Sequence, residues 1–171
     1  MAIANEIVRL RALEPSDLEL LYLWENDSEV WRVSQTIAPI SRDSLAKLIS
    51  DQVYDIYASR QMRLMIDVDS VSVGCVDLFN FEPLHRRFGL GILIYASENR
   101  RKGYASRVIE QVKEYARNTL DLKQIWVNIG EDNHASIALF ESCGFTLSAR
   151  RKEWINRGSK FIDELEYQYI F

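Results

Sequence analysis

The segment from residue 91 to residue 128 constrains the fold of this chain most strongly. The apolar run Gly91-Ile92-Leu93-Ile94-Tyr95 is typical of a buried strand. Residues 105–118 carry apolar side chains at helical spacing, and Gln124-Ile125-Trp126-Val127-Asn128 is again typical of a strand. A strand, a helix and a second strand in this order allow a parallel pair in the sheet.

The rest of the chain adds strands that pair as hairpins. A short Asp69-Ser70 turn joins two strand-like runs and predicts one such hairpin. Strands are expected at about 7–13, 63–68, 71–79, 88–95, 124–128, 146–155 and 160–170, and helices from Pro15, from Ser41 to about Val53, at 105–118 and at 133–143. No linker or repeat interrupts this order. We therefore expect an α/β (α+β) fold in one domain, 1–171, with a mixed, mostly antiparallel central sheet of about seven strands flanked by about four helices.

A basic turn, Arg100-Arg101-Lys102-Gly103-Tyr104-Ala105, joins the strand at 91–95 to its helix. The first N–H groups of a helix have no intrahelical partner and lie at the positive end of the helix dipole. Gly103 lets the backbone approach a ligand closely. The turn therefore favours an anion, most simply a pyrophosphate. The alternative is a basic turn that only ends the strand.

Composition excludes several classes of protein. The chain has 171 residues, of which 47% are hydrophobic and 27% charged, as in ordinary globular proteins. No apolar run approaches the roughly 18 residues of a membrane span, and the first residues do not resemble a signal peptide. A net charge of −4 argues against nucleic acid as the main partner. The two cysteines and two histidines lack metal-ligand spacing. We expect a cytoplasmic protein with no metal, no membrane and no nucleic acid partner.

Charge is distributed unevenly along the chain. Residues 12–31 hold six acidic residues and no lysine or arginine, whereas basic residues gather at 85–87, 100–102 and 150–152. This asymmetry suits a protein that meets an anionic cofactor on one side and a cationic substrate on another. Glu25 and Asp27, at the end of the first helix, are the candidates for binding that substrate. For most of the six acids the alternative is a solvated helix face.

Two motifs resemble those of the GNAT N-acetyltransferases. The basic turn is similar to the family pattern Gln/Arg-x-x-Gly-x-Gly/Ala, and residues 133–145 are similar to Asn-x-x-Ser/Ala-x-x-Leu-Tyr/Phe-x-x-x-Gly-Phe. They stand in the family's order, and the expected elements resemble the family fold. Gly74-Cys75-Val76-Asp77-Leu78 with His85-Arg86 resembles the bacterial spermidine N-acetyltransferases, and the tail 154–164 is equally similar to the ribosomal-protein N-acetyltransferase branch.

The resemblance implies acetyl-CoA as co-substrate. Backbone N–H groups of the basic turn would hold its pyrophosphate, and the strand before the turn would splay from its neighbour and pair with the pantetheine arm. One strand N–H would polarise the thioester carbonyl. Asn133 would bond the pantetheine, although it also suits a helix N-cap. The implied cofactor-binding residues are Leu93, Ile94, Tyr95, Arg100, Arg101, Lys102, Gly103, Tyr104, Ala105, Asn133, Ser136 and Phe140.

The catalytic half of the site departs from the family pattern. Many members donate a proton to the leaving thiolate from a tyrosine, but Phe140 stands at that position and would pack against the thiol end of the cofactor. A thiol pKa near 8.5 makes the thiolate a stable leaving group, so water or a substrate proton would suffice. The strand at 88–91 lacks the family's glutamate. Asp77 is therefore the candidate general base, and the alternative is a solvent-facing residue or one paired with Arg86 or Arg87.

The function that follows is acetyl-CoA-dependent N-acetylation of a primary amine, with a polyamine-like small molecule as the favoured acceptor. A protein N-terminal amine is the alternative acceptor, because the tail resembles the ribosomal-protein branch equally; acidic residues near the entrance would favour a polyamine, and a wide cleft would favour a peptide N-terminus. The departures at Phe140 and at the strand glutamate also leave open a non-catalytic acyl-CoA-binding module. A homodimer is a possible assembly.

Overall fold

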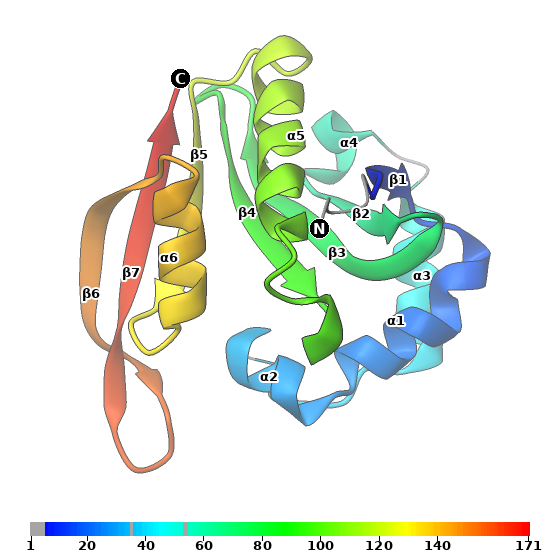
Figure 1. Ribbon diagram of the computed structural model, residues 1–171, viewed down its shortest axis with the longest axis horizontal. Helices are drawn as coiled ribbons and strands as arrows, with labels where there is room; N and C mark the ends of the chain where they lie inside the picture. Colours follow the sequence, from blue (N-terminus) through cyan, green and yellow to red (C-terminus); the bar gives the residue numbers. More distant parts are fainter. Residues whose placement is uncertain (1–5, 35, 53–54) are drawn as a thin grey trace, which may run out of the picture.

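The computed structural model describes residues 6–34, 36–52 and 55–171. Seven strands form one sheet in the order β1-β2-β3-β4-β5-β7-β6 (Figure 1). Of the pairings in this sheet only β4–β5 is parallel, so the prediction of a mixed, mostly antiparallel sheet is confirmed. The strands are β1 Val8–Ala12, β2 Met62–Val68, β3 Val71–Glu82, β4 Arg87–Ile94, β5 Gln124–Gly130, β6 Thr146–Asn156 and β7 Phe161–Ile170.

Six α-helices flank the sheet within the described residues, where we expected about four. They are α1 Leu18–Glu25, α2 Ser28–Ser34, α3 Arg42–Asp51, α4 Ile56–Ser59, α5 Tyr104–Asn118 and α6 His134–Ser142, with 3-10 turns at η1 Pro15–Asp17 and η2 Ser97–Asn99. The four expected helices are present. The additional ones, α2 and α4, have seven and four residues, too few for a clear apolar period. Val53 and residues 1–5, on which the signal-peptide expectation partly rests, lie outside the described residues.

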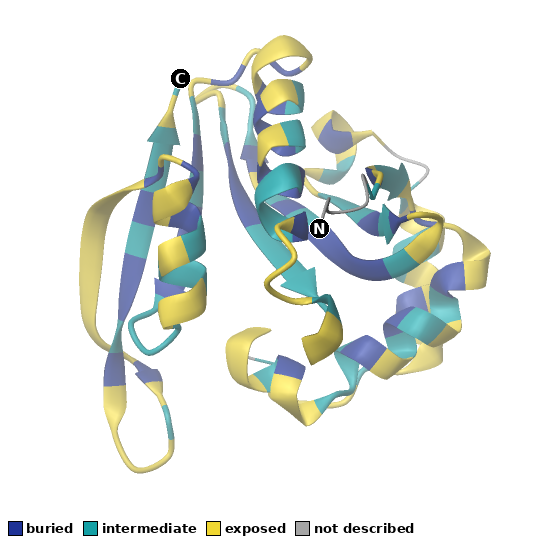
Figure 2. Cartoon of the chain, in the orientation of Figure 1, coloured by how far each residue is buried: buried dark blue, intermediate teal, exposed yellow. Residues whose placement is uncertain are grey.

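The sheet separates two apolar cores. On one face, α5 buries Val108, Ile109 and Val112 against the central strands, and α6 adds Phe140. On the other face, α1 and α3 pack against a smaller cluster that includes Trp24 and the buried Cys75 (members: Leu13, Leu21, Trp24, Leu45, Met65, Cys75). The strand β6 is at one edge of the sheet, and Figure 2 shows it exposed along most of its length.

The parallel pair β4–β5 opens along its length. Only three residue pairs join the strands, ending at Gly89–Trp126. Beyond Gly89, β4 continues for five more residues, to Ile94, without pairing with β5, which is paired with β7 on its other edge along its whole length. Figure 1 shows the two strands together at one end and apart at the other. The splay places the end of β4 and the start of α5 beside an opening in the sheet.

Candidate active site

A cavity of about 430 Å³ occupies the opening between β4 and β5. Leu90 to Leu93 line it from β4, and Val127 to Gly130 line it from β5. The start of α6 contributes Asn133 and Ser136, and α2 contributes Val30 and Val33 near its mouth. The cavity therefore joins the region before the basic turn to the first turn of α6, the two segments that carry the sequence motifs.

Beyond Gly89, every second residue of β4 points its N–H and C=O groups away from β3, toward the gap between β4 and β5. The Tyr95 N–H donates to the Val73 carbonyl of β3 at 2.8 Å. Because hydrogen bonding alternates along an antiparallel ladder, Leu93 also points its peptide groups toward β3, and Ile94 points away from it. Of the three strand residues expected to meet the cofactor through their backbone, Ile94 alone presents its peptide groups to the gap. Its carbonyl accepts a hydrogen bond from Arg100 Nε at 3.3 Å.

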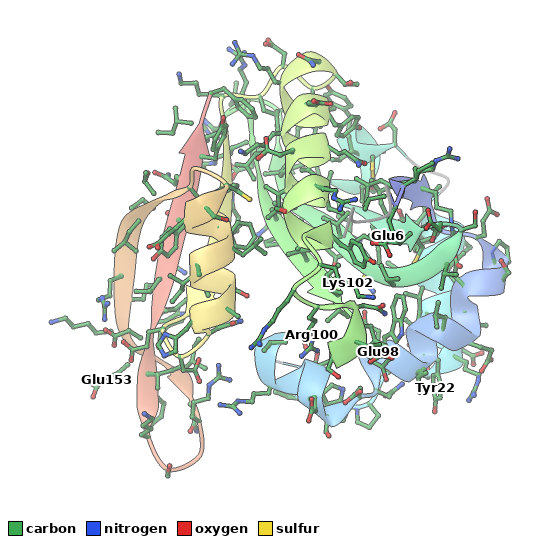
Figure 3. The ribbon with its side chains drawn as sticks, in the orientation of Figure 1. Glu6, Tyr22, Glu98, Arg100, Lys102 and Glu153 are labelled. Atoms are coloured by element: carbon green, nitrogen blue, oxygen red, sulfur yellow. The ribbon has the colours of Figure 1, made fainter. Side chains whose placement is uncertain are left out.

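The basic turn leads from this edge into α5. Gly103 is the N-cap of α5 with φ of +77°, a left-handed conformation that disfavours a side chain. Arg101, Lys102 and Gly103 are all exposed. Figure 3 shows the Arg100 side chain extending from the turn toward the space between α5 and α6. These features leave the first amides of α5 open to an anion.

Tyr104 is buried, unlike residues 101–103 of the basic turn. Its ring is only 3% exposed, and its hydroxyl donates to Glu6 Oε2 at 2.8 Å. Its ring therefore ties the N-terminal segment to α5, and only its backbone is available to a ligand at the turn. The neighbouring Ala105 is half-buried in the first turn of α5.

The start of α6 combines a helix cap with a cavity wall. Asn133 Oδ1 accepts the backbone N–H of Ser136 at 3.2 Å, so the N-cap interpretation of Asn133 holds. Both residues also line the cavity. Phe140, one turn further on, lines it with a ring that is 4% exposed and packs edge-on against Phe145 at 5.1 Å between centroids.

Arg63 organises the acidic side of the cavity. Its Nε and one terminal nitrogen donate to the two carboxylate oxygens of Asp77 at 2.6 and 2.8 Å, and its other terminal nitrogen donates to Glu25. Burial opposes the charge on Arg63, but the hydrogen bonds to Asp77 outweigh it and raise the pKa of the guanidinium. Two carboxylates against one guanidinium leave one net negative charge beside the cavity.

The alternative interpretation of Asp77 as an arginine-paired residue is confirmed, but its partner is Arg63 and not Arg86 or Arg87. Arg86 forms an ion pair with Asp121 at 2.7 Å, and Arg87 forms one with Glu82 at 2.9 Å. Both arginines lie where β4 begins, whereas Asp77 lies opposite Gly91 in the middle of β4.

The structure separates the two acids proposed to bind substrate. Glu25 lines the cavity, and its side chain is 12% exposed. Asp27 is not among the described residues that line the cavity. It accepts a hydrogen bond from the Tyr95 hydroxyl at 3.1 Å, while the Tyr95 ring stacks on Trp24 with centroids 5.4 Å apart. Asp27 and Tyr95 therefore connect α1 to the end of β4.

Crowding excludes a side chain at Gly89, one position of the strand that lacks the family's glutamate. A Cβ at Gly89 would lie 2.5 Å from the ring of Phe79 and 2.8 Å from that of Trp126, so any side chain there requires both rings to move. The two rings meet edge-on at 5.2 Å between centroids, and Phe79 lines the cavity. Two aromatic rings thus occupy the space at Gly89, whereas a Cβ at Gly91 would make only ordinary contacts, at 3.8 Å.

Arg157 is a further cavity residue that the sequence did not reveal. From the turn between β6 and β7 it donates to both carboxylate oxygens of Asp132, at 2.9 and 3.0 Å, and to the Arg32 carbonyl at 2.7 Å. It therefore links α2, the β5–α6 loop and the C-terminal hairpin at the cavity. No local pattern signals this contact, because 125 residues separate Arg157 from Arg32.

Two expected absences can be stated only for the described part of the chain. Within it, no three histidine, cysteine or carboxylate side chains are grouped so as to hold a metal ion. No helix in the same residues is long and apolar enough to cross a membrane.

Comparison with known proteins connects this site to a family. A model of the acetyltransferase (GNAT) domain matches residues 8–146. Spermidine N(1)-acetyltransferase of Vibrio cholerae is 28% identical over 142 residues, covering 82% of this chain and 80% of that protein. The Escherichia coli K12 protein of the same name is 25% identical over 140 residues, covering 82% of this chain and 73% of its own.

A solved structure shows the same fold. The crystal structure of spermidine N-acetyltransferase from Vibrio cholerae in complex with CoA and spermine has a TM-score of 0.86 and 24% identity, over 95% of both chains. The chain belongs to the GNAT acetyltransferase family. It is an N-acetyltransferase, an enzyme that transfers an acetyl group to an amine.

Proposed function

We propose that this protein transfers the acetyl group of acetyl-CoA to a primary amine of a polyamine-like small molecule. One observation carries the proposal: the cavity follows β4 as far as Leu93, shortly before the basic turn and the start of α5, and another part of its wall holds Glu25, Asp77 and Arg63 with one net negative charge. The turn and the adjoining part of the cavity suit the pyrophosphate and pantetheine of CoA, and the acidic wall suits an alkylammonium group. The relatives named for spermidine acetylation support the choice of a polyamine.

At the cofactor end, the chain offers backbone groups more than side chains. The open amides at the start of α5 would bind the pyrophosphate. The Ile94 peptide would pair with a pantetheine amide, and Arg100 would then release the Ile94 carbonyl that it holds now. Asn133 and Ser136 would contact the pantetheine from the opposite side of the cavity. Phe140 would pack against the thiol end.

At the acceptor end, Asp77 would bind the ammonium group. Its side chain is 36% exposed, whereas those of Arg63 and Glu25 are 16% and 12% exposed, so Asp77 is the most solvent-accessible member of the cluster. Arg63 fixes its orientation through two hydrogen bonds. A positioned carboxylate both attracts the ammonium and can accept its proton.

The chemistry requires an ammonium to lose a proton before its nitrogen attacks the thioester carbonyl. The new C–N bond forms, the C–S bond breaks, and CoA leaves as a thiolate. The nitrogen loses a second proton, and the thiolate gains one. No tyrosine among the described residues lines the cavity. Water or the substrate therefore supplies the proton to the thiolate.

The direct experiment measures acetyl transfer from acetyl-CoA across polyamines, peptides with free N-termini and aminoglycosides. We expect the highest kcat/KM with a polyamine, and the same rate after treatment with EDTA. A clear preference for a peptide would reassign the acceptor to a protein N-terminus. Tight CoA binding without transfer to any amine would instead indicate an acyl-CoA-binding module. Light scattering of the same protein would test for the homodimer, and cell fractionation would test for a cytoplasmic location.

A further inference from the structure

A second cavity lies directly beyond Asp77. It has a volume of about 240 Å³ and is bounded by α3, β2 and β3. Arg63, Asp77 and Phe79 line both this cavity and the larger one between β4 and β5. The two spaces are therefore neighbours, separated by the carboxylate that would bind the acceptor and by the aromatic ring beside it.

Among the described residues, the shared Arg63 and Asp77 are the only charged residues in the walls of the second cavity. Leu48, Met62 and Phe79 are apolar, and the polar side chains are the carboxamides of Gln52 and Gln61. Among the described residues Asp77 is its only carboxylate. An ammonium group left there without a partner would lose solvation and gain no ion pair. A chain of methylene groups, by contrast, would exchange water for the apolar walls.

We propose that this second cavity is an acceptor-chain subsite. It takes the uncharged alkyl segment next to the reacting ammonium of the acceptor, which Asp77 holds at the boundary between the cavities, and the next ammonium of a polyamine lies beyond this segment in water. This inference rests on the proposed transfer to an amine and adds how the acceptor is selected: by the length of the uncharged segment next to its ammonium. Phe79 acts as a specificity-determining residue, because its ring walls both cavities.

The first test uses wild-type protein and linear n-alkylamines of increasing length. We expect kcat/KM to rise by about fourfold with each added methylene until the cavity is full, and then to level off. The KM for acetyl-CoA should stay constant. Calorimetric titration of the same amines into the CoA-bound protein should give dissociation constants that fall with the same dependence on length.

A second test places a charge inside the cavity. Gln52 Oε1 accepts the backbone N–H of Arg63 at 3.2 Å, and a glutamate at position 52 keeps that acceptor. We expect Gln52→Glu to raise the kcat/KM of a diamine relative to a monoamine of the same length by about tenfold, because the second ammonium gains a partner. Ala46→Glu adds the same charge to the exposed side of α3 and should leave this ratio unchanged.

The outcomes separate this inference from the proposed function. Transfer to amines with no dependence on chain length, and no change of the ratio in Gln52→Glu, would overturn the subsite and leave the function intact. Absence of transfer to every amine would overturn the function. In that case binding that still strengthens with chain length would support the subsite, and binding independent of length would refute it.

Discussion

Arg63 lies directly opposite Asp77 in the β2–β3 ladder and donates two hydrogen bonds to its carboxylate, at 2.6 and 2.8 Å. The bidentate geometry holds both carboxylate oxygens in fixed directions. Glu25, from the end of α1, accepts a further hydrogen bond from the same guanidinium. Residues from two strands and a helix thus set the position of Asp77, which among the described residues is the one carboxylate that lines both cavities.

Replacing Asp77 with asparagine should remove the binding site for the ammonium. We expect kcat/KM for the amine to fall by about a hundredfold, a typical loss for a positioned acid–base group, with the KM for acetyl-CoA unchanged. Steady-state kinetics with each substrate varied in turn measures both. Glu82→Gln is the matched control, since Glu82 is also on β3 and also pairs with an arginine but lies outside both cavities. An Asp77→Asn variant as active as the control would refute the assigned role.

Replacing Gly103 with valine should weaken CoA binding. The left-handed backbone at this position costs a side chain about 1–2 kcal/mol, and the β-branched group would crowd the approach to the first amides of α5. Gly158→Val provides the control, because Gly158 has φ of +83° and no atoms near its Cβ position, in the turn between β6 and β7. Both variants should lose similar stability in urea titrations. Only Gly103→Val should raise the CoA dissociation constant measured by calorimetry, and equal constants would remove the turn from the site.

Phe140→Tyr would restore a hydroxyl at the position of the family tyrosine. We expect turnover to stay the same or to rise, because the ring lines the cavity and the hydroxyl would add a proton donor. Phe145→Tyr places the same hydroxyl on the neighbouring ring, which is 2% exposed and outside the cavity lining. That control should lose about 1–3 kcal/mol of stability from a buried unpaired hydroxyl. A large loss of kcat in folded Phe140→Tyr would contradict the packing role of the phenyl ring.

Asp17 should contribute acid-sensitive stability. Two hydrogen bonds of 2.8 Å from Arg11 lower the pKa of Asp17, against the opposing effect of burial. Since the folded-state pKa lies below the unfolded value of about 3.9, the contribution is complete above that pH and is lost as pH falls through the folded pKa.

Asp17→Asn tests this contribution. It should lower the free energy of unfolding by about 1–2 kcal/mol at pH 7, because Arg11 keeps its ion pair with Asp67, and the difference from wild type should shrink below about pH 4. Urea titrations at pH 7, 5 and 3 measure it. Glu19 forms an exposed ion pair with Arg42, so Glu19→Gln should change the free energy of unfolding little at pH 7, 5 or 3. A difference for Asp17→Asn that is constant with pH would contradict the linkage.

The Cys75 thiol should take no part in proton transfer, although it lines the cavity. Burial raises the pKa of this thiol to about 12, and the residue is 3% exposed. Burial also raises the pKa of Cys143. A thiol reagent at pH 8 should therefore modify neither cysteine until the protein unfolds, and Cys75→Ala should keep the wild-type kcat. Rapid labelling of one thiol in the native protein would refute this.

The parts of the protein that the sequence predicts well are those defined by local patterns. The strand–turn–helix–strand segment around Gly103 appears as β4, α5 and β5, because a continuous apolar run and an apolar period of 3.6 residues are both visible in the local sequence. The N-cap at Asn133 could also be predicted, because asparagine directly before a helix is a preferred N-cap residue. The short helices α2 and α4 were not predicted, because seven and four residues contain too few apolar positions to show a helical period.

What the sequence alone determined is therefore the order of elements, the basic turn and the α6 motif, all properties of residues close together in the chain. Tertiary structure decided the acidic end of the site. A two-residue turn at Asp69-Ser70 would set Arg63 opposite Val76, but a bulge between Ile66 and Asp67 shifts the register and brings Asp77 to it instead. A register shift of one residue exchanges the two faces of a strand. Packing of the sheet, which no local pattern encodes, thus places Arg63 and Asp77 together on the face that α1 reaches with Glu25.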